Sequence, residues 1–253
     1  MSIQLLEQLL PFVAVGFAAQ LVDGALGMAF GVISNTLLIS LGVPPAAASA
    51  GVHTVETFTT AASGISHVLH RNVDWRLFRR LAIPGIIGGL LGAYVLSSVD
   101  ASVARPFVLA YLAAIGVYLL WRALRHRHPP EREPRFVAPL GLVGGFLDAA
   151  GGGGWGPVVT SNLLVQGGCP RRTVGTVNTT EFFLTATVSA TFIARLGWEA
   201  FTTATAGLLI GGLVASPLGA IMAKRLPTRT LLLLVGTVLT LTSLYGVASA
   251  LMR

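Results

Sequence analysis

The chain has 253 residues, of which 53% are hydrophobic and 11% charged, and its mean hydropathy is +0.76. Because a soluble domain carries about 25% charged residues, we expect an all-α integral membrane protein that crosses the cell membrane several times. The single cysteine, Cys169, excludes an intramolecular disulfide and a cysteine metal cluster. The net charge of +7 indicates no nucleic-acid partner, since the arginines lie near the ends of predicted helices.

Helical segments follow one another in chain order, five in each half. They are expected at 5–22, 29–42, 45–70, 75–98 and 101–121, and then at 136–148, 155–167, 170–195, 199–223 and 229–252. The last two segments of each half are apolar and long enough to cross about 30 Å of hydrocarbon. The first two are separated by glycine-dense breaks at 23–31 and 148–157, which cannot hold a regular helix.

The two halves are copies of one unit. When residues 16–60 are aligned without a gap to 141–185, 13 of 45 positions are identical, against about four expected by chance from this composition. We therefore divide the chain into a first membrane repeat (1–121), a basic linker (122–135) and a second membrane repeat (136–253). Each repeat is expected to contain a re-entrant or broken helical hairpin and three transmembrane helices.

Basic residues predict the orientation, because cytoplasmic loops are enriched in Lys and Arg. If each hairpin dips in and returns, 14 of the 17 basic residues face the cytoplasm and only Arg105, Arg195 and Arg253 lie outside. Both termini are then outside and the central linker is cytoplasmic. The loop at 71–74 faces in and its counterpart at 196–199 faces out, so the repeats have inverted topology, which points to a binding site near the midplane.

Four acids lie within the hydrophobic stretches. Asp23 and Glu56 are 33 residues apart, as are Asp148 and Glu181. A carboxylate at membrane depth is costly, so these residues mark a functional site. We expect Asp23 and Asp148 to cap the hairpin turns by accepting backbone N–H bonds. Burial without a basic partner favours the protonated acid of the Glu pair, which links substrate binding to proton release. The simpler alternative for the Glu pair is a structural hydrogen bond.

The helices that start near Ala29 and Trp155 point their N-termini into the interior. Such an end carries about half a positive charge and binds anions, and the hydrophobic stretches offer no Lys or Arg at depth. The alternative is that Gly151 to Gly154 only allow close helix packing. His53 and Thr54 can share a face with Glu56 in the third segment, and they align with Asn178, Thr179 and Glu181 of the second repeat. A lone histidine such as His53 is commonly structural, although it is also able to share the Glu56 proton.

These motifs resemble the TauE/SafE sulfite-exporter family. The second half has the glycine-rich hairpin G-L-V-G-G-F-L-D-A-A-G-G-G-G-W-G-P (141–157) and N-T-T-E-F (178–182). The first half has V-D-G-A-L-G-M-A-F-G (22–31) and H-T-V-E-T-F (53–58), followed by N-V-D-W-R (72–76). The likeness covers essentially the whole chain. It implies secondary transport of small sulfur-containing anions such as sulfite or organosulfonates, generally out of the cell, with no catalysis.

Carried over by position, the resemblance implies that both hairpin tips and both third segments line the substrate path. The residues concerned are Gly27, Ala29, Phe30, His53, Thr54, Glu56, Gly152, Gly153, Gly154, Trp155, Asn178, Thr179 and Glu181. The first repeat departs from the glycine-dense pattern, with Met28, Ala29 and Phe30 where the second has Gly153, Gly154 and Trp155.

We weigh two other classes of function. The buried acids, together with His53, would also suit a cation or metal-ion transporter, in which ionised carboxylates converge on one ion. An intramembrane enzyme is not expected, because no nucleophile motif accompanies the aspartates. We expect a small anionic substrate and the lipid bilayer as partners and no cofactor or bound metal, and leave the particular anion and the oligomeric state open.

Overall fold

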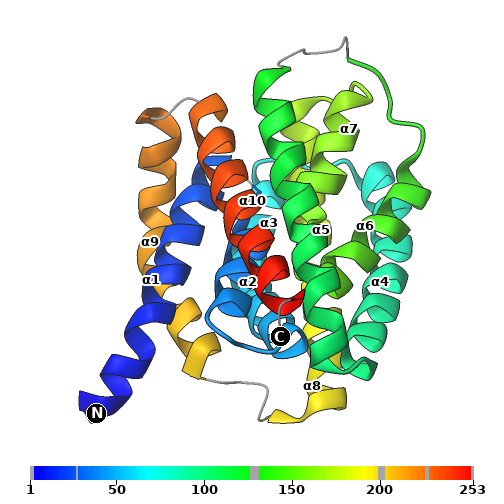
Figure 1. The fold of residues 1–253 in the computed structure, drawn as a ribbon. Coiled ribbons are helices and arrows are strands. Elements are labelled where there is room, and N and C mark those ends of the chain that lie inside the picture. Colours follow the sequence, from blue (N-terminus) through cyan, green and yellow to red (C-terminus); the bar gives the residue numbers. More distant parts are fainter. Residues whose placement is uncertain (1–2, 27, 126–130, 199–202, 226–227, 252–253) are drawn as a thin grey trace.

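The computed structural model describes residues 3–26, 28–125, 131–198, 203–225 and 228–251. All regular structure in these ranges is helical (Figure 1). The first half contains α1 (Ile3–Leu26), α2 (Phe30–Ser40), α3 (Pro45–Leu69), α4 (Trp75–Ser98) and α5 (Ala101–Leu124). The second half contains α6 (Val137–Gly151), the π-helical turn η1 (Trp155–Thr160), α7 (Ser161–Val165), α8 (Pro170–Leu196), α9 (Thr203–Arg225) and α10 (Thr228–Leu251).

Proline and aspartate residues mark the starts of four of the helices. Pro45 and Pro170 occupy the first turn of α3 and α8, where a missing N–H costs nothing. The Asp74 carboxylate caps α4 by accepting from the backbone N–H groups of Arg76 and Leu77, and Asp100 caps α5 by accepting from that of Ser102. These caps separate long apolar segments into distinct helices.

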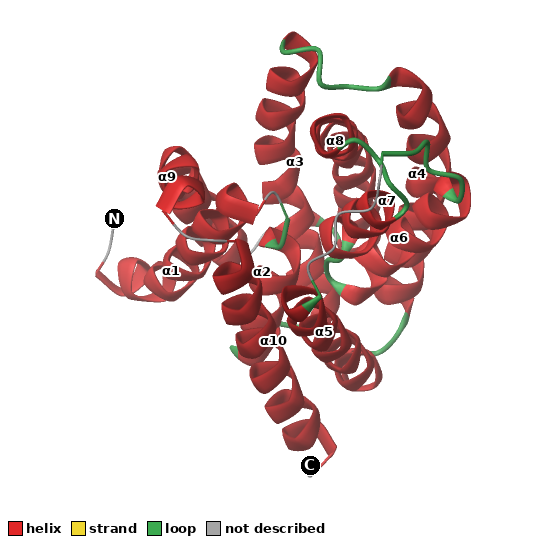
Figure 2. Cartoon of the chain, turned by 90° about the horizontal axis from the view of Figure 1, so that it is seen from above, coloured by secondary structure: helices red, strands yellow, loops and turns green. Residues whose placement is uncertain are grey.

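The main helix contacts join one half of the chain to the other. The helix α1 packs on α9, α4 on α6, α5 on α10 and α3 on α8 (Figure 2). In the repeat, α1, α3, α4 and α5 correspond to α6, α8, α9 and α10. Exchange of the two halves therefore converts the α1–α9 pair into the α6–α4 pair, and it leaves the α5–α10 and α3–α8 pairs unchanged. Small residues allow these contacts: a Cβ at Gly88 of α4 would lie 2.0 Å from the carbonyl oxygen of Leu142, and one at Gly211 of α9 would lie 2.0 Å from that of Val13.

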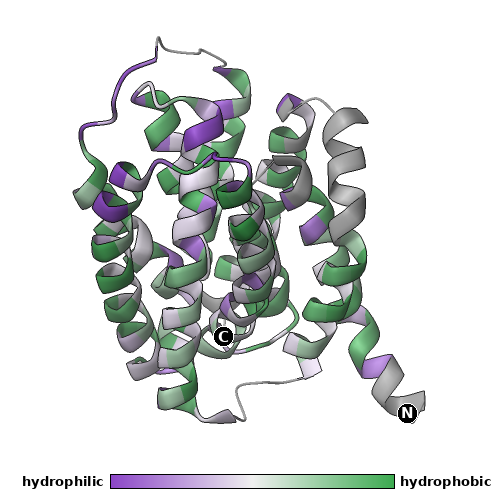
Figure 3. Ribbon diagram, turned by 180° about the vertical axis from the view of Figure 1, so that it is seen from behind, coloured by the Kyte–Doolittle hydropathy of each residue, from purple (hydrophilic) through white to green (hydrophobic). Residues whose placement is uncertain are grey.

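The outer surface suits lipid. Three helical stretches are long and apolar enough to cross a membrane among the described residues, Trp75–Ser98, Ala101–Leu124 and Leu232–Ser249. Large apolar side chains point outward from them, such as Phe107 and Tyr245, which are 72% and 76% exposed. Hydrophilic residues gather instead toward the end of the molecule that carries the linker (Figure 3). The composition and the surface together are those of a membrane protein.

The basic loops assigned to the cytoplasm lie together at the linker end. Arg80 Nη1 is 3.2 Å from Glu133 Oε1, which joins the start of α4 to the linker. The guanidinium of Arg171, in the first turn of α8, donates to Asn72 Oδ1 at 2.5 Å. The chain between α3 and α4, the linker and the start of α8 therefore meet at one end.

Two of the three arginines assigned to the outside, Arg105 and Arg195, lie at the opposite end, and the third, Arg253, lies outside the described residues. Arg195 Nη2 donates to Ser98 Oγ at 2.9 Å, at the end of α4 that is farther from the linker. Arg105, in the first turns of α5, donates to the carbonyl oxygen of Ile39 at 3.0 Å. The two groups of arginines thus mark the two ends of the helix bundle.

The helix boundaries differ from the expected ones at both hairpins. The helix α1 continues through Asp23 to Leu26 and α6 continues through Asp148 to Gly151, so both aspartates lie inside helices. The first break lies between Leu26 and Phe30, where Gly27 is outside the described residues, and the second shortens to 152–154. The expected helix at 155–167 starts as a π-helical turn and ends at Val165. In the second break three residues suffice for the reversal, because the adjacent positive φ values of Gly152, Gly153 and Gly154 turn the chain sharply.

Candidate functional site

The two hairpin breaks meet in the interior of the helix bundle. A Cβ at Gly153 would lie 2.6 Å from the carbonyl carbon of Gly31, and one at Gly156 would lie 2.5 Å from the Cβ of Met28. Gly152, Gly153 and Gly154 all have positive φ, 78°, 122° and 146°. Only glycine adopts three such conformations in a row without strain and allows two backbones to approach this closely.

Each break is closed by the aspartate that precedes it. Asp23 Oδ1 accepts from the backbone N–H of Phe30 at 3.1 Å, and Asp148 Oδ1 accepts from that of Trp155 at 2.8 Å. Both bonds span seven residues, so the two hairpins are closed in the same way. The residue before each half-helix has a positive φ, 119° at Ala29 and 146° at Gly154.

These bonds change what the half-helix N-termini offer to a ligand. The first N–H of each is already bonded to a carboxylate, and the backbone of Gly31 also hydrogen-bonds the Glu56 carboxylate. An anion at these ends must therefore use the N–H groups that remain or replace a carboxylate. The aspartates therefore occupy the first N–H group of both half-helices.

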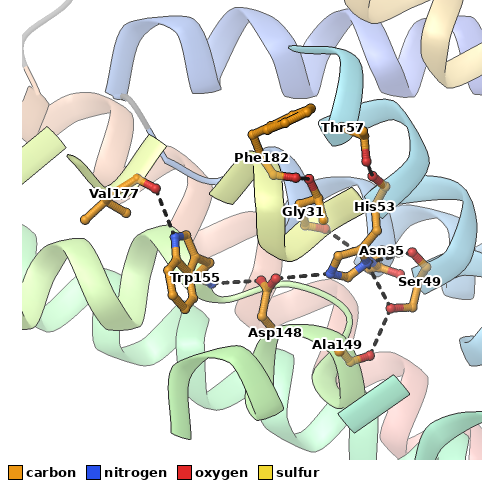
Figure 4. A network of polar contacts seen from close by, with 11 residues as sticks. Gly31, Asn35, Ser49, His53, Thr57, Asp148, Ala149, Trp155, Val177 and Phe182 are labelled. Atoms are coloured by element: carbon orange, nitrogen blue, oxygen red, sulfur yellow. Dashed lines mark hydrogen bonds and ion pairs between the residues drawn. The ribbon is translucent and has the colours of Figure 1, made fainter. Parts of the chain in front are cut away.

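His53 links α3 of the first half to the hairpin of the second. Its ring is fully buried, with Nε2 3.0 Å from Asp148 Oδ2 and Nδ1 2.7 Å from the carbonyl oxygen of Ser49 (Figure 4). The Ser49 hydroxyl donates to the carbonyl oxygen of Ala149 at 3.0 Å, next to Asp148. The close partner of His53 is thus Asp148, whereas sharing a proton with Glu56 was the alternative considered from the sequence.

The contacts determine how many protons this pair holds. Because a carbonyl oxygen only accepts, Nδ1 of His53 must carry a hydrogen. One more proton then lies between Nε2 and Asp148 Oδ2, either as imidazolium and carboxylate or as neutral imidazole and carboxylic acid. Either form is neutral overall, which lowers the desolvation cost of burying the pair in a membrane interior.

Glu56 and Glu181 lie beside the same centre. The Glu56 side chain is buried, and a Cβ at Gly31 would lie 3.0 Å from its Oε1. Its carboxyl interacts electrostatically with those of Asp148, Glu181 and Asp23. Glu181 is half-buried and interacts with both aspartates. The four acids singled out from the sequence therefore converge, although they come from α1, α3, α6 and α8.

Thr54 in α3 and the repeat-equivalent residues Asn178 and Thr179 in α8 do not share the surroundings of His53. Thr54 Oγ1 lies 2.7 Å from Ser189 Oγ, across the contact between α3 and α8. Asn178 Nδ2 lies 3.4 Å from His67 Nε2, and the Thr179 hydroxyl bonds the carbonyl of Gly175 one turn earlier. Asn178 therefore does not repeat the contact that His53 makes with an aspartate, and the two halves differ at the centre.

The hairpin residues assigned to the substrate path are packed tightly. Trp155 is fully buried and its indole N–H donates to the carbonyl of Val177 at 3.4 Å, while Phe30 and Ala29 are 3% and 5% exposed. Gly27 lies outside the described residues. Among those described, no group of three or more His, Cys, Asp and Glu has the arrangement of a metal site.

Three polar residues near the hairpins escaped the sequence reasoning. The Tyr111 hydroxyl and Asn35 Oδ1 are buried without a hydrogen-bond partner, beside Gly154 and Gly152 respectively. Arg122 was assigned to the linker, but α5 continues to Leu124 and the Arg122 guanidinium reaches Ser161 and Met28. The spacing of Tyr111 and Arg122, eleven residues, places them on one face of α5, which is the signal in the sequence that would have found them.

A bundle with a lipid-facing exterior and converging buried acids at two broken hairpins defines a membrane transporter. The chain belongs to the family Sulfite exporter TauE/SafE, which matches residues 12–246. It is 42% identical over 240 residues to the Probable membrane transporter protein YtnM of Bacillus subtilis (strain 168), covering 91% of this chain and 80% of that protein.

A more distant relative is the Sulfite exporter TauE/SafE family protein 3 of Arabidopsis thaliana. The identity is 26% over 112 residues, which cover 44% of this chain and 24% of that protein. No solved structure gives a significant match. The resemblance inferred from the motifs is therefore confirmed at the level of the family.

Proposed function

We propose that the protein exports small sulfur-containing anions, such as sulfite or organosulfonates, by alternating access. The observation that carries this proposal is the contact between the two broken hairpins, each closed by an aspartate, in the interior of a membrane bundle. Discontinuous helices that meet in this way mark substrate sites in secondary transporters. The family to which the chain belongs supports the class of substrate.

The repeats are proposed to have inverted topology, with the linker in the cytoplasm and both termini outside. Exchange of the halves preserves the main helix pairs, as a two-fold relation requires. Arg80 and Arg171 lie at the linker end, and Arg105 and Arg195 at the other. The larger basic cluster on the linker side supports a cytoplasmic linker.

Substrate is proposed to bind beside the hairpin tips and to exchange with protons. The path would be lined by Gly27, Ala29, Phe30, His53, Thr54, Glu56, Gly152, Gly153, Gly154, Trp155, Asn178, Thr179 and Glu181, with Asp23 and Asp148 as structural caps. An ionised Glu56 repels a nearby anion, and a protonated one donates a hydrogen bond to it. Proton release from Glu56 therefore weakens anion binding, which couples the two movements.

Substrate counterflow in proteoliposomes tests the proposal. Vesicles that contain the purified chain are loaded with unlabelled sulfite or methanesulfonate and diluted into the labelled anion. We expect transient accumulation of label that protein-free vesicles do not show. If no sulfite, sulfonate or carboxylate accumulates at any pH between 5 and 8, the chain is not an anion transporter of this kind.

A cation transporter is the second candidate, favoured by the interactions of Glu56 with the other three acids and of Glu181 with both aspartates. In that case at least two acids are ionised and hold one ion. The same vesicles then accumulate an alkali or divalent cation, and Glu56→Gln and Glu181→Gln each abolish the uptake. Cation uptake that is unchanged in both variants excludes this candidate.

A further inference from the structure

Arg122 stands out because its positive charge has no acidic partner in the part of the chain that the structure describes. It lies on α5, two residues before the helix ends, and its side chain is half-buried. The ion pairs of the described residues are those of His53 with Asp148 and of Arg76 and Arg80 with Glu133, none of which includes Arg122. A partly desolvated guanidinium without a counter-ion is costly, so its retention needs an explanation.

The guanidinium points at the hairpins and away from lipid. Its Nη1 donates to Ser161 Oγ, at the start of α7, and lies 3.3 Å from Met28 Sδ in the first break. Ser161 is fully buried and Met28 is 8% exposed. Arg122 therefore connects both hairpins, and most of its five N–H donors stay free of protein acceptors among the described residues.

The neighbours of Arg122 show on which side of the hairpin tips it lies. The half-helix η1 and α7 runs from the hairpin tip toward the linker end, where Gln166 accepts from the backbone N–H of Arg135. Ser161 lies between these two points, so Arg122 is on the linker side of the tips. Arg122 therefore presents its positive charge on the linker side of the centre.

We infer that Arg122, with the Ser161 hydroxyl, forms the site that receives the substrate anion from the linker side. A guanidinium presents paired N–H donors that match two oxygens of a sulfonate or sulfite, and the hydroxyl supplies a third contact. The anion is then passed to the hairpin tips, where Met28 adjoins Gly156. This inference rests on the proposed transport of small anions and adds the residue and the side from which the substrate is loaded.

Binding of methanesulfonate and of sulfite to the full chain tests the inference. The protein is held in nanodiscs of phosphatidylcholine, and the dissociation constant is measured by calorimetry for the wild type, Arg122→Gln, Arg122→Lys and Arg125→Gln. We expect about 10- to 100-fold weaker binding for Arg122→Gln, the range for loss of a charge-assisted hydrogen bond. Arg122→Lys should lie between, because a lysine keeps the charge but loses the fork.

Arg125→Gln is the matched control. Arg125 is exposed on the same helix, with its guanidinium 5.5 Å from the ring centre of Trp121, and its loss should leave the dissociation constant unchanged. If Arg122→Gln does not fold, Ser161→Ala decides, since it removes only the hydroxyl and should weaken binding about 3- to 10-fold. If the wild type, Arg122→Gln and Ser161→Ala bind the anions with equal affinity, the inference is overturned and the proposed function stays intact.

Three further outcomes have distinct meanings. If the wild type binds neither probe, the proposed function fails and the inference fails with it. If phosphatidylglycerol in the nanodisc stabilises the wild type but not Arg122→Gln, while methanesulfonate binds both equally, Arg122 holds a lipid headgroup and the inference is wrong. A structural role would lower the melting temperature of Arg122→Gln without changing the further rise that the anion causes.

Discussion

Replacing Gly153 by alanine tests the contact between the two hairpin breaks. Gly153 has a φ of 122°, and a Cβ there would lie 2.6 Å from both the carbonyl carbon of Gly31 and the nitrogen of Val32. Real side chains do not approach a backbone this closely, so the two hairpins must separate. The substitution therefore adds two costs, a strained backbone and a displaced neighbour.

Gly42→Ala separates these costs. Gly42 has a φ of 96° and no atom within 4 Å of the position of a Cβ. The backbone strain of an L-residue with positive φ is about 1–2 kcal/mol in either variant. Overpacking adds about 1–3 kcal/mol to Gly153→Ala alone. At about 2–4 °C per kcal/mol for a chain of this size, Gly153→Ala should melt about 2–12 °C below Gly42→Ala.

The measurement is thermal unfolding of both variants in the same detergent, followed by counterflow in proteoliposomes. We expect Gly42→Ala to keep transport and Gly153→Ala to lose it, because the tips can no longer meet. If both variants melt at the same temperature and transport equally, the hairpins do not touch at Gly31, and the site must be built differently.

The other predictions concern single groups at the centre. Ala29→Gly should raise the melting temperature by about 2–8 °C, since Ala29 has a φ of 119° that glycine adopts without strain; an unchanged temperature would show that the strain is absent. His53→Asn and Asp148→Asn should each cost about 3–5 kcal/mol by leaving a buried partner unpaired, and the double variant should cost less than their sum; additive losses in a double-mutant cycle would refute the pairing. Glu56→Gln, a mimic of the protonated acid, should bind methanesulfonate equally at pH 5 and pH 8, whereas wild-type binding should weaken as the pH rises; parallel pH curves would contradict the role given to Glu56.

Much of the fold could be predicted because its signals are local. Hydropathy and the caps at Asp74 and Asp100 define α4 and α5 to within a few residues. The glycine runs locate both hairpin breaks, although the helices α1 and α6 run further than expected. Glycine lowers helix stability by only about 1 kcal/mol, so packing of α6 against α4 is able to keep Ala149 to Gly151 helical.

Contacts between the halves could not be predicted, because a single sequence does not show which helices pack together. The pairing of His53 with Asp148 joins residues 95 positions apart. The repeat aligns His53 with Asn178 of α8, but the His53 ring contacts Asp148 of α6. Arg122 was misplaced for a different reason. A long side chain at a helix end is able to reach several ångströms along the axis, so the position of its Cα does not locate its charge.

The differences between the repeats carry more information about mechanism than their similarities. Both halves provide a capped break, and this shared part is sufficient to form a closed centre. His53 has no histidine counterpart, since Asn178 occupies the equivalent position, and Arg122 lies on the linker side of the centre. A strictly symmetric transporter would present the same groups to both sides of the membrane and bind its substrate equally from each. If the protein transports anions as we propose, a proton-carrying pair on one hairpin and the Arg122 guanidinium on the linker side would give its two faces different affinities for the anion, which would allow loading at one face and release at the other.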